Sequence, residues 1–178
     1  MIIGLVPGAM KPYHAGHHFL TMAALAECDS VIILTTTKDR GPISGMVMLQ
    51  IWETYIIPNL PAGITVQFTN SPVGEVYDIL DRENENPTKH EYRLYGGTED
   101  LARFPADYVG RQYPNVAARF TNVAQSDSAS FLRGVGDSPM VKGAWIRKAL
   151  ELGDVTKFTS MMPKFLQPHA EDIFNMLK

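Results

Sequence analysis

The sequence holds a single cysteine, no long hydrophobic run and little excess charge, and each shortage excludes a class of protein. With only Cys28 available, an internal disulfide is impossible, which is typical of a reducing compartment. No apolar stretch approaches the roughly 18 residues of a membrane-spanning helix. A net charge of -3 over 178 residues gives no general attraction to nucleic acid or to an anionic membrane. Any phosphate that the chain binds must therefore be held by a local group of residues.

The remaining composition is that of an ordinary globular enzyme. Hydrophobic residues make up 45% of the chain and charged residues 20%, and no repeat or low-complexity tract is present. The sequence opens on a strand pattern without a basic leader, so we expect no signal peptide and a cytoplasmic location. We predict one domain over 1–178, with a sheet-and-helix core in 1–123 and C-terminal helices in 140–178.

Short β-branched runs alternate with helical patterns, which predicts an α/β fold. Strands are predicted at 2–6, 30–37, 64–69, 92–95 and 116–123. Helices are predicted at 19–26, 44–57, 73–80, 101–104, 107–113, 140–152, 154–162 and 168–177, with loops at 81–89 and 124–139. Ser44 is a predicted N-cap, and Trp52 is interpreted as core packing rather than a base-stacking platform. The pattern favours a Rossmann-like, doubly wound parallel sheet of five strands with helices on both faces.

The most informative stretch is a strand, a turn and a helix start within the first 26 residues. The apolar run 2–6 is followed by the loop 7–13 and then by His14, Gly16 and His17 in the first turn of a helix. A helix N-terminus presents unpaired N–H groups and the positive end of the helix dipole, so it suits an anion. Imidazoles donate hydrogen bonds to phosphate oxygens, and a glycine permits close backbone approach. These residues predict a phosphate site at the end of the first strand.

Residues 8–17, GAMKPYHAGH, resemble the H-x-G-H signature of the nucleotidyltransferase superfamily, which includes cytidylyltransferase-like and adenylyltransferase-like enzymes. In that family the signature follows strand one and opens helix one, as predicted here. The resemblance implies that His14, His17 and Lys11 are catalytic. It implies nucleotide contacts at Gly8, Ala9, Met10 and Gly16, although relatives usually carry an aromatic residue at the position of Met10. The compact C-terminus suits phage-encoded members of the family.

Without the resemblance, the two histidines have another interpretation. They are also compatible with a histidine-rich surface helix start or with a metal-binding pair. No Cys, Asp or Glu lies next to His14 or His17 in the sequence, which weighs against a metal site.

The family supplies further phosphate contacts from a late I-S-x-T-x-x-R motif at another helix start. Residues 141–150, VKGAWIRKAL, resemble that motif, which implies that Arg147, the motif arginine, is a fourth catalytic residue and that Lys142 and Ile146 contact the nucleotide. Lys142 and Ala144 replace the motif serine and threonine, so two hydroxyl donors are lost. Residues 126–133, SDSASFLR, form a second alignment that keeps hydroxyls and an arginine. We prefer the first because a stronger helical pattern follows it.

Two other groups of residues are predicted to contact ligands. Gly96, Gly97, Asp100 and Arg103 follow the fourth predicted strand and resemble the family segment that borders base and ribose. Asp100 and Arg103 are equally compatible with a local i,i+3 ion pair. Lys38 and Arg40 follow the second strand, where open α/β sheets bind ligands, and are predicted substrate contacts. An ordinary surface position is the alternative for Lys11 and Lys38.

The resemblance implies an enzyme that moves CMP or AMP from CTP or ATP to a phosphorylated small molecule, releasing pyrophosphate. Mg²⁺ is expected to accompany the nucleoside triphosphate rather than to occupy a protein cage. Nucleic acid and membrane are not expected partners, and a homo-oligomer is a weak expectation from the family. The main alternative is a non-catalytic nucleotide-binding or regulatory module of the same fold. A class I aminoacyl-tRNA synthetase fragment would need a K-M-S-K-S loop, and a flavodoxin-like carrier would not place two histidines at the first helix start.

Overall fold

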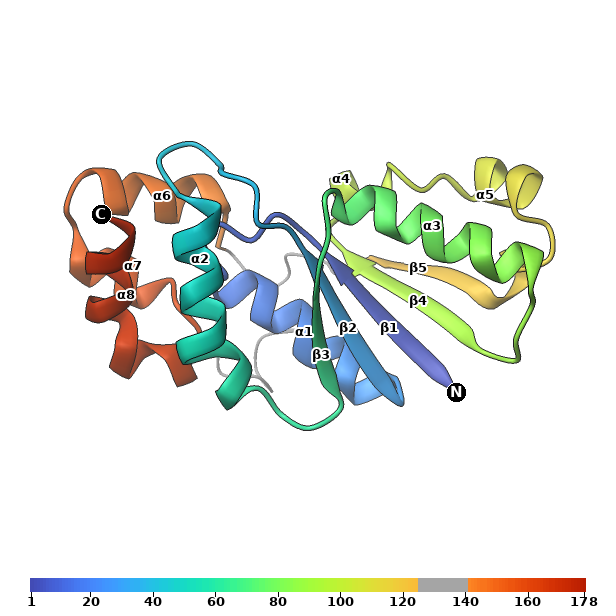
Figure 1. Ribbon diagram of the computed structural model, residues 1–178, viewed down its shortest axis with the longest axis horizontal. Helices are drawn as coiled ribbons and strands as arrows, with labels where there is room; N and C mark the ends of the chain where they lie inside the picture. The colour runs from blue at the N-terminus through green and yellow to red at the C-terminus, as the bar shows by residue number, and fades with distance from the viewer. Residues whose placement is uncertain (125–140) are drawn as a thin grey trace. The chain divides into compact units, whose positions relative to one another are not determined.

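The computed structural model describes residues 1–124 and 141–178, which fall into two compact units (Figure 1). The sheet unit contains Met1–Gly8, Leu20–Thr35 and the chain from Gly63 to the end of β5 (Phe120–Ala124). The helical unit contains Ala9–Phe19, Thr36–Ala62 and the described residues 141–178. The helix α1 (Ala15–Glu27) belongs to both, because its first residues count with the helical unit and its remainder with the sheet unit.

The sheet unit is a five-stranded parallel sheet, as the sequence predicts. Its strands are β1 (Ile2–Pro7), β2 (Ser30–Thr35), β3 (Ile64–Phe68), β4 (Glu91–Gly96) and β5, in the order β3-β2-β1-β4-β5. Leu5 of β1 is in register with Ile32 on one side and with Leu94 on the other. The strand order reverses beside β1, so the carboxyl end of β1 lies at the topological switch point, where such sheets bind ligands.

Helices cover both faces of this sheet. Successive strand residues point to opposite faces, and Gly4 and Leu5 show which helix covers each. Leu5 joins an apolar cluster with residues of α3 (Pro72–Glu85) and α5 (Ala106–Gln112), on the face where Figure 1 shows α3. On the other face, α1 packs so closely that a Cβ on Gly4 would lie 3.1 Å from the Cβ of Ala24. The fold is therefore Rossmann-like and doubly wound.

The helical unit packs around a buried apolar core that includes Trp52 and Tyr13. Its elements are α2 (Gly45–Ile51), a π-helix (Trp52–Ile56), a 3-10 helix (Ile57–Asn59), α6 (Gly143–Glu151), α7 (Val155–Ser160), a 3-10 helix (Lys164–His169) and α8 (Ala170–Leu177). The Ser44 hydroxyl accepts from the Val47 N–H at 3.3 Å, which confirms the predicted N-cap. Trp52 is fully buried, with its ring centroid 5.0 Å from that of Tyr13, which confirms that it is a core residue.

Several predicted boundaries of helices, strands and loops are wrong. The predicted loop 81–89 begins as helix, because α3 continues to Glu85 and Glu83 turns inward to accept from the Tyr92 hydroxyl at 2.8 Å. The predicted helix 101–104 lies three residues early, as α4 (Thr98–Leu101), because Gly97 caps it and its first turn carries two acidic residues. The first part of the predicted strand 116–123 is a 3-10 turn, Ala117–Arg119.

One predicted helix of the C-terminal part also differs. The predicted helix 168–177 is divided, because Pro168 lies inside the 3-10 helix and α8 begins at Ala170. The second alignment of the late motif, 126–133, lies outside the described residues. Among the helices of residues 1–124 and 141–178, none has the length and apolar character needed to cross a bilayer.

Candidate functional site

The first turn of α1 is capped by the side chain of the residue before it, His14. His14 precedes the helix, and its Nδ1 accepts the backbone N–H of Gly16 at 3.0 Å and of His17 at 3.4 Å. The N–H of Ala15 donates to the Met161 carbonyl at 2.9 Å. The sequence predicted that these backbone donors hold the anion, and the structure corrects this, because all three already have acceptors within the protein. An anion bound at this position would contact the imidazole rings instead.

The two signature imidazoles form a stacked pair with a defined tautomer. Their ring centroids lie 3.7 Å apart, with 21° between the ring planes. The Nδ1 of His17 accepts the backbone N–H of His14 at 3.2 Å. A ring nitrogen that accepts an N–H must carry a lone pair, so these hydrogen bonds assign the proton of each neutral ring to Nε2. Both rings are thereby set up as Nε2–H donors.

Burial keeps both rings neutral. Burial, together with the charge of Arg147, lowers the pKa of His14 to about 3. Burial also holds the pKa of His17 well below its usual value, with further lowering by His14 and Arg147. At neutral pH the pair therefore contributes two N–H donors and no charge.

Positive charge comes from Lys11 and Arg147, which the structure brings together. The guanidinium Nη1 of Arg147, on α6, donates to the backbone carbonyl of Lys11 at 3.1 Å, although the two residues are 136 positions apart. The Lys11 side chain is buried, which contradicts the alternative of a surface lysine. Its Nζ donates to the carbonyls of Ala9, at 3.0 Å, and Thr36. Burial and the nearby Arg40 lower the pKa of Lys11, and Asp39 partly offsets them.

Arg40 adds positive charge near Arg147. None of the described side-chain contacts connects Lys38 to these cations. The charge of Arg40 lowers the pKa of Arg147, after burial as the larger cause. Asp39 has a structural role as well, because its Oδ1 accepts the N–H of Gly45 at 2.7 Å at the start of α2. Lys38 is exposed and its backbone N–H donates to the Thr36 hydroxyl at 3.2 Å.

Two glycines make this arrangement possible. A Cβ on Gly16 would lie 2.9 Å from the His14 ring and 3.0 Å from the Val141 carbonyl oxygen, so a side chain there would displace one of them. The predicted close approach at Gly16 is therefore made by the protein's own groups. A Cβ on Gly143 would lie 2.7 Å from Nη1 of Arg147, so this glycine leaves the space that the guanidinium occupies.

The other predicted nucleotide contacts of the helical unit differ in character. Met10 is buried and has a φ of 51°, a left-handed conformation that costs a non-glycine residue about 1–2 kcal/mol. Lys142 is exposed, with Nζ 5.7 Å from the ring centroid of Trp145. The Ile146 side chain is fully buried, so any ligand contact at that position falls to its backbone.

The remaining predicted contacts belong to the sheet unit. The N–H of Gly8 donates to the Leu34 carbonyl at 2.9 Å. Gly97 is the N-cap of α4, and Asp100 and Arg103 are exposed. Among the described residues, no ion pair joins Asp100 to Arg103, so the local pair that sequence reasoning offered for them is not formed.

Sequence reasoning missed Thr36, His18 and Gly143 as parts of the site. The Thr36 carbonyl holds the Lys11 ammonium, and the Nδ1 of His18 lies 2.9 Å from the Tyr13 hydroxyl, which fixes the tyrosine beside the signature. A carbonyl has no sequence signal. The role of Gly143 could have been predicted from the sequence, because Arg147 lies four residues later, about one helical turn away.

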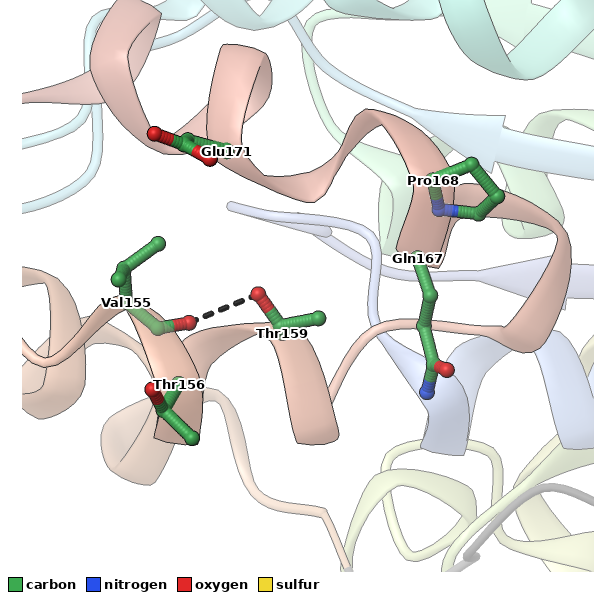
Figure 2. Close-up of a pocket in the computed structure, with 6 residues that line it drawn as sticks. All are labelled: Val155, Thr156, Thr159, Gln167, Pro168 and Glu171. Atoms are coloured by element: carbon green, nitrogen blue, oxygen red, sulfur yellow. Dashed lines mark hydrogen bonds between the residues drawn. The ribbon is translucent and has the colours of Figure 1, made fainter.

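The helical unit also has a surface pocket, formed by α7, the 3-10 helix that follows it and the first turn of α8 (Figure 2). Within it, the Thr159 hydroxyl donates to the Val155 carbonyl at 2.7 Å. Its lining consists of Val155, Thr156, Thr159, Gln167, Pro168 and Glu171. None of the predicted ligand contacts lines this pocket.

The donor set of the site suits an anion rather than a resident metal. In 1–124 and 141–178, no three His, Cys, Asp or Glu side chains gather as metal ligands would. The groups around the stacked histidines are N–H donors and cations, whereas Mg²⁺ prefers oxygen ligands.

Comparison with known proteins identifies the fold. No family model matches the sequence, and no curated protein matches it. Among solved structures, Plasmodium falciparum nicotinic acid mononucleotide adenylyltransferase complexed with NaAD superposes with a TM-score of 0.60 at 11% identity. The match covers 99% of this chain and 97% of that one. The chain has the fold of this adenylyltransferase.

Two longer proteins have the same fold over part of their length. A bifunctional NMN adenylyltransferase/ADP ribose pyrophosphatase from Francisella tularensis matches with a TM-score of 0.57 at 13% identity. The match covers 97% of this chain and 51% of that one, so the chain spans about half of the bifunctional protein. Thermotoga maritima TmcAL, bound with alpha-thio ATP, matches with a TM-score of 0.52 at 12% identity, over 99% of this chain and 55% of that one.

Proposed function

We propose that this protein is a nucleotidyltransferase that moves a nucleoside monophosphate from a nucleoside triphosphate to a phosphorylated small molecule. The observation that carries the proposal is the stacked pair His14 and His17, with both Nε2 atoms protonated and Arg147 beside them. Neutral N–H donors and a fixed cation are the groups that stabilise charge developing on phosphate oxygens. The fold shared with adenylyltransferases supports the same reaction class.

The reaction needs few groups beyond these. A phosphoryl oxygen of the acceptor attacks the α-phosphorus, the bond from that phosphorus to the bridging oxygen breaks, and pyrophosphate leaves with the electron pair. The acceptor oxygen is already ionised, so no general base is required. His14 and His17 donate Nε2–H to the α-phosphate oxygens, and Arg147 binds the pyrophosphate part, with Mg²⁺ carried in by the triphosphate. Positioning and electrostatic stabilisation supply the rate.

The other predicted ligand contacts are kept in the proposal, each within its own unit. Nucleotide contacts are assigned to Ala9, Met10, Lys142 and the backbone of Ile146 in the helical unit, and to Gly8, Gly96, Gly97, Asp100 and Arg103 in the sheet unit. Lys38 and Arg40 are assigned to the phosphorylated acceptor. The named activities of the similar structures favour ATP as the nucleotide donor, and CTP is the alternative donor. We further propose that the chain works as one cytoplasmic domain that forms a homo-oligomer and binds neither nucleic acid nor membrane.

Nucleotide binding is the first test. A thermal-shift panel of ATP, CTP, GTP and UTP with Mg²⁺ is run on the wild type, on His17→Ala and on His169→Ala. A ligand at 100 times its dissociation constant adds about 2.7 kcal/mol of stability, which raises Tm by several degrees. We expect ATP or CTP to stabilise the wild type and His169→Ala, whose histidine lies against Tyr55 outside the site, and to stabilise His17→Ala much less. No shift with any nucleotide would contradict the proposal.

A non-catalytic nucleotide-binding module is the second candidate. Lys142 and Ala144 stand where the family motif has hydroxyl donors, and this observation favours it. Such a module would give the thermal shift without releasing pyrophosphate from any nucleotide and acceptor. Pyrophosphate release coupled to loss of the acceptor would exclude it.

A further inference from the structure

Lys11 is buried, and its ammonium is engaged by the protein itself. Its side chain is 2% exposed, and Nζ donates to the carbonyls of Ala9, at 3.0 Å, and Thr36. A desolvated ammonium is costly unless its N–H groups have partners, and here backbone carbonyls of two separate loops provide them. The charge therefore joins the signature loop to the loop that follows β2.

The backbone of Lys11 is the acceptor for Arg147. The Lys11 carbonyl receives Nη1 of Arg147 at 3.1 Å, and Gly143 provides the space in which that guanidinium lies. The guanidinium in turn is close enough to His14 and His17 to lower the pKa of both. The side chain of Lys11 thus fixes a loop whose carbonyl holds the cation of the proposed site.

We propose that Lys11 is a positioning residue, whose ammonium ties the Ala9 and Thr36 carbonyls together and so fixes the Lys11 carbonyl that orients Arg147. This inference rests on the proposed function only in calling Arg147 a phosphate ligand. It replaces the expectation that Lys11 is itself catalytic. Lys11 acts through Arg147 and contacts no substrate.

The first test uses the protein without nucleotide. Lys11→Ala removes three carbons and the ammonium, a fragment that propylammonium replaces. We expect Lys11→Ala to lower Tm and millimolar propylammonium to restore part of the loss, because both carbonyl acceptors belong to the protein. Lys157→Ala, which removes an exposed ammonium on α7, is the matched control and should show no such recovery. The neutral analogue 1-propanol should stabilise neither variant.

The outcomes separate this inference from the proposed function. Recovery of Lys11→Ala only when nucleotide is present would overturn the inference, since the ammonium would then contact the ligand. An unchanged Tm in Lys11→Ala would overturn it too. The decisive measurement is the recovery of Tm by propylammonium without nucleotide. It therefore tests the role of Lys11 even if the wild type binds no nucleotide.

A double-mutant cycle tests whether Lys11 acts on nucleotide binding through Arg147. It also replaces the first test if Lys11→Ala does not fold. Lys11→Met keeps the apolar stem and removes the charge, and it is combined with Arg147→Met. We expect each single variant to weaken nucleotide binding by about tenfold, the scale of one hydrogen bond to a charged group. The double variant should bind no more weakly than Arg147→Met, because Lys11 acts through that residue. Losses that multiply to about a hundredfold would show that Lys11 contacts the nucleotide independently and would overturn the inference.

Discussion

At the scale of single residues, the decisive feature is how the signature histidines use their two ring nitrogens. The Nδ1 atoms of His14 and His17 are acceptors for backbone N–H groups, so each ring directs an N–H donor elsewhere through Nε2. An ordinary helix N-terminus would offer backbone donors to an anion. Here the histidines take those donors and replace them with two imidazole N–H groups.

The depressed pKa values predict acid sensitivity. In the unfolded chain His14 binds a proton near pH 6.5, whereas in the folded protein it does so only near pH 3. Between these values the unfolded state binds more protons, so the free energy of unfolding falls as the pH falls. From pH 8 to pH 5 this residue alone removes about 2 kcal/mol. His17 acts in the same direction.

Denaturant unfolding of His14→Asn at the two pH values measures this contribution. Asparagine keeps a side-chain acceptor for the helix N-terminus but does not titrate. We expect the variant to lose distinctly less stability between pH 8 and pH 5 than the wild type. The measurement at pH 8 is the control, since both histidines are neutral there in either state. Equal losses in the two proteins would mean that His14 is protonated in the fold.

At the scale of elements, α6 shows how a glycine can serve a neighbouring side chain. Gly143 and Gly110 are both helical glycines, in α6 and α5. A Cβ on Gly143 would meet Arg147 at 2.7 Å, whereas nothing lies within 4 Å of one on Gly110. Alanine is therefore expected to act differently at the two positions.

We predict that Gly110→Ala stabilises the protein by about 0.5–1 kcal/mol through helix propensity. It should leave nucleotide binding unchanged. Gly143→Ala should change stability little, because the flexible end of the arginine moves aside, but should weaken nucleotide binding by about tenfold. Titration of both variants with the nucleotide that stabilises the wild type checks this. Equal affinities would show that Arg147 does not hold the nucleotide.

Element by element, the sequence predicted most of what depends on local chemistry. The strands around β1 and the Ser44 cap follow from residue types and spacing. The burial of Lys11 was not predictable, because its partner Thr36 is remote in sequence. The inward orientation of Glu83 could not be predicted either, because its hydrogen-bond partners lie on β4 and in the loop before it.

At the scale of the whole molecule, each of the two compact units is built from several separate segments of the chain. The boundaries between them fall after Gly8, Phe19, Thr35 and Ala62, and again beyond β5. One of these boundaries lies within α1, so neither unit is a continuous segment. We therefore keep the prediction of a single domain.

Calorimetry tests that prediction. A single domain should unfold in one transition whose calorimetric and van't Hoff enthalpies agree. The interleaved chain provides the reason, because one unit cannot unfold without releasing loops of the other. Two resolved transitions, or a calorimetric enthalpy well above the van't Hoff value, would show that the units are separate folding domains.

The central claim is transfer of a nucleoside monophosphate, and the most direct measurement follows phosphorus. ³¹P NMR of the protein with Mg²⁺, ATP or CTP and a set of phosphorylated acceptors reports every product at once. We predict pyrophosphate together with a new phosphoanhydride that joins nucleotide and acceptor, and neither product with His17→Ala. Bound but unconverted nucleotide with every acceptor, or inorganic phosphate as the only product, would contradict the account.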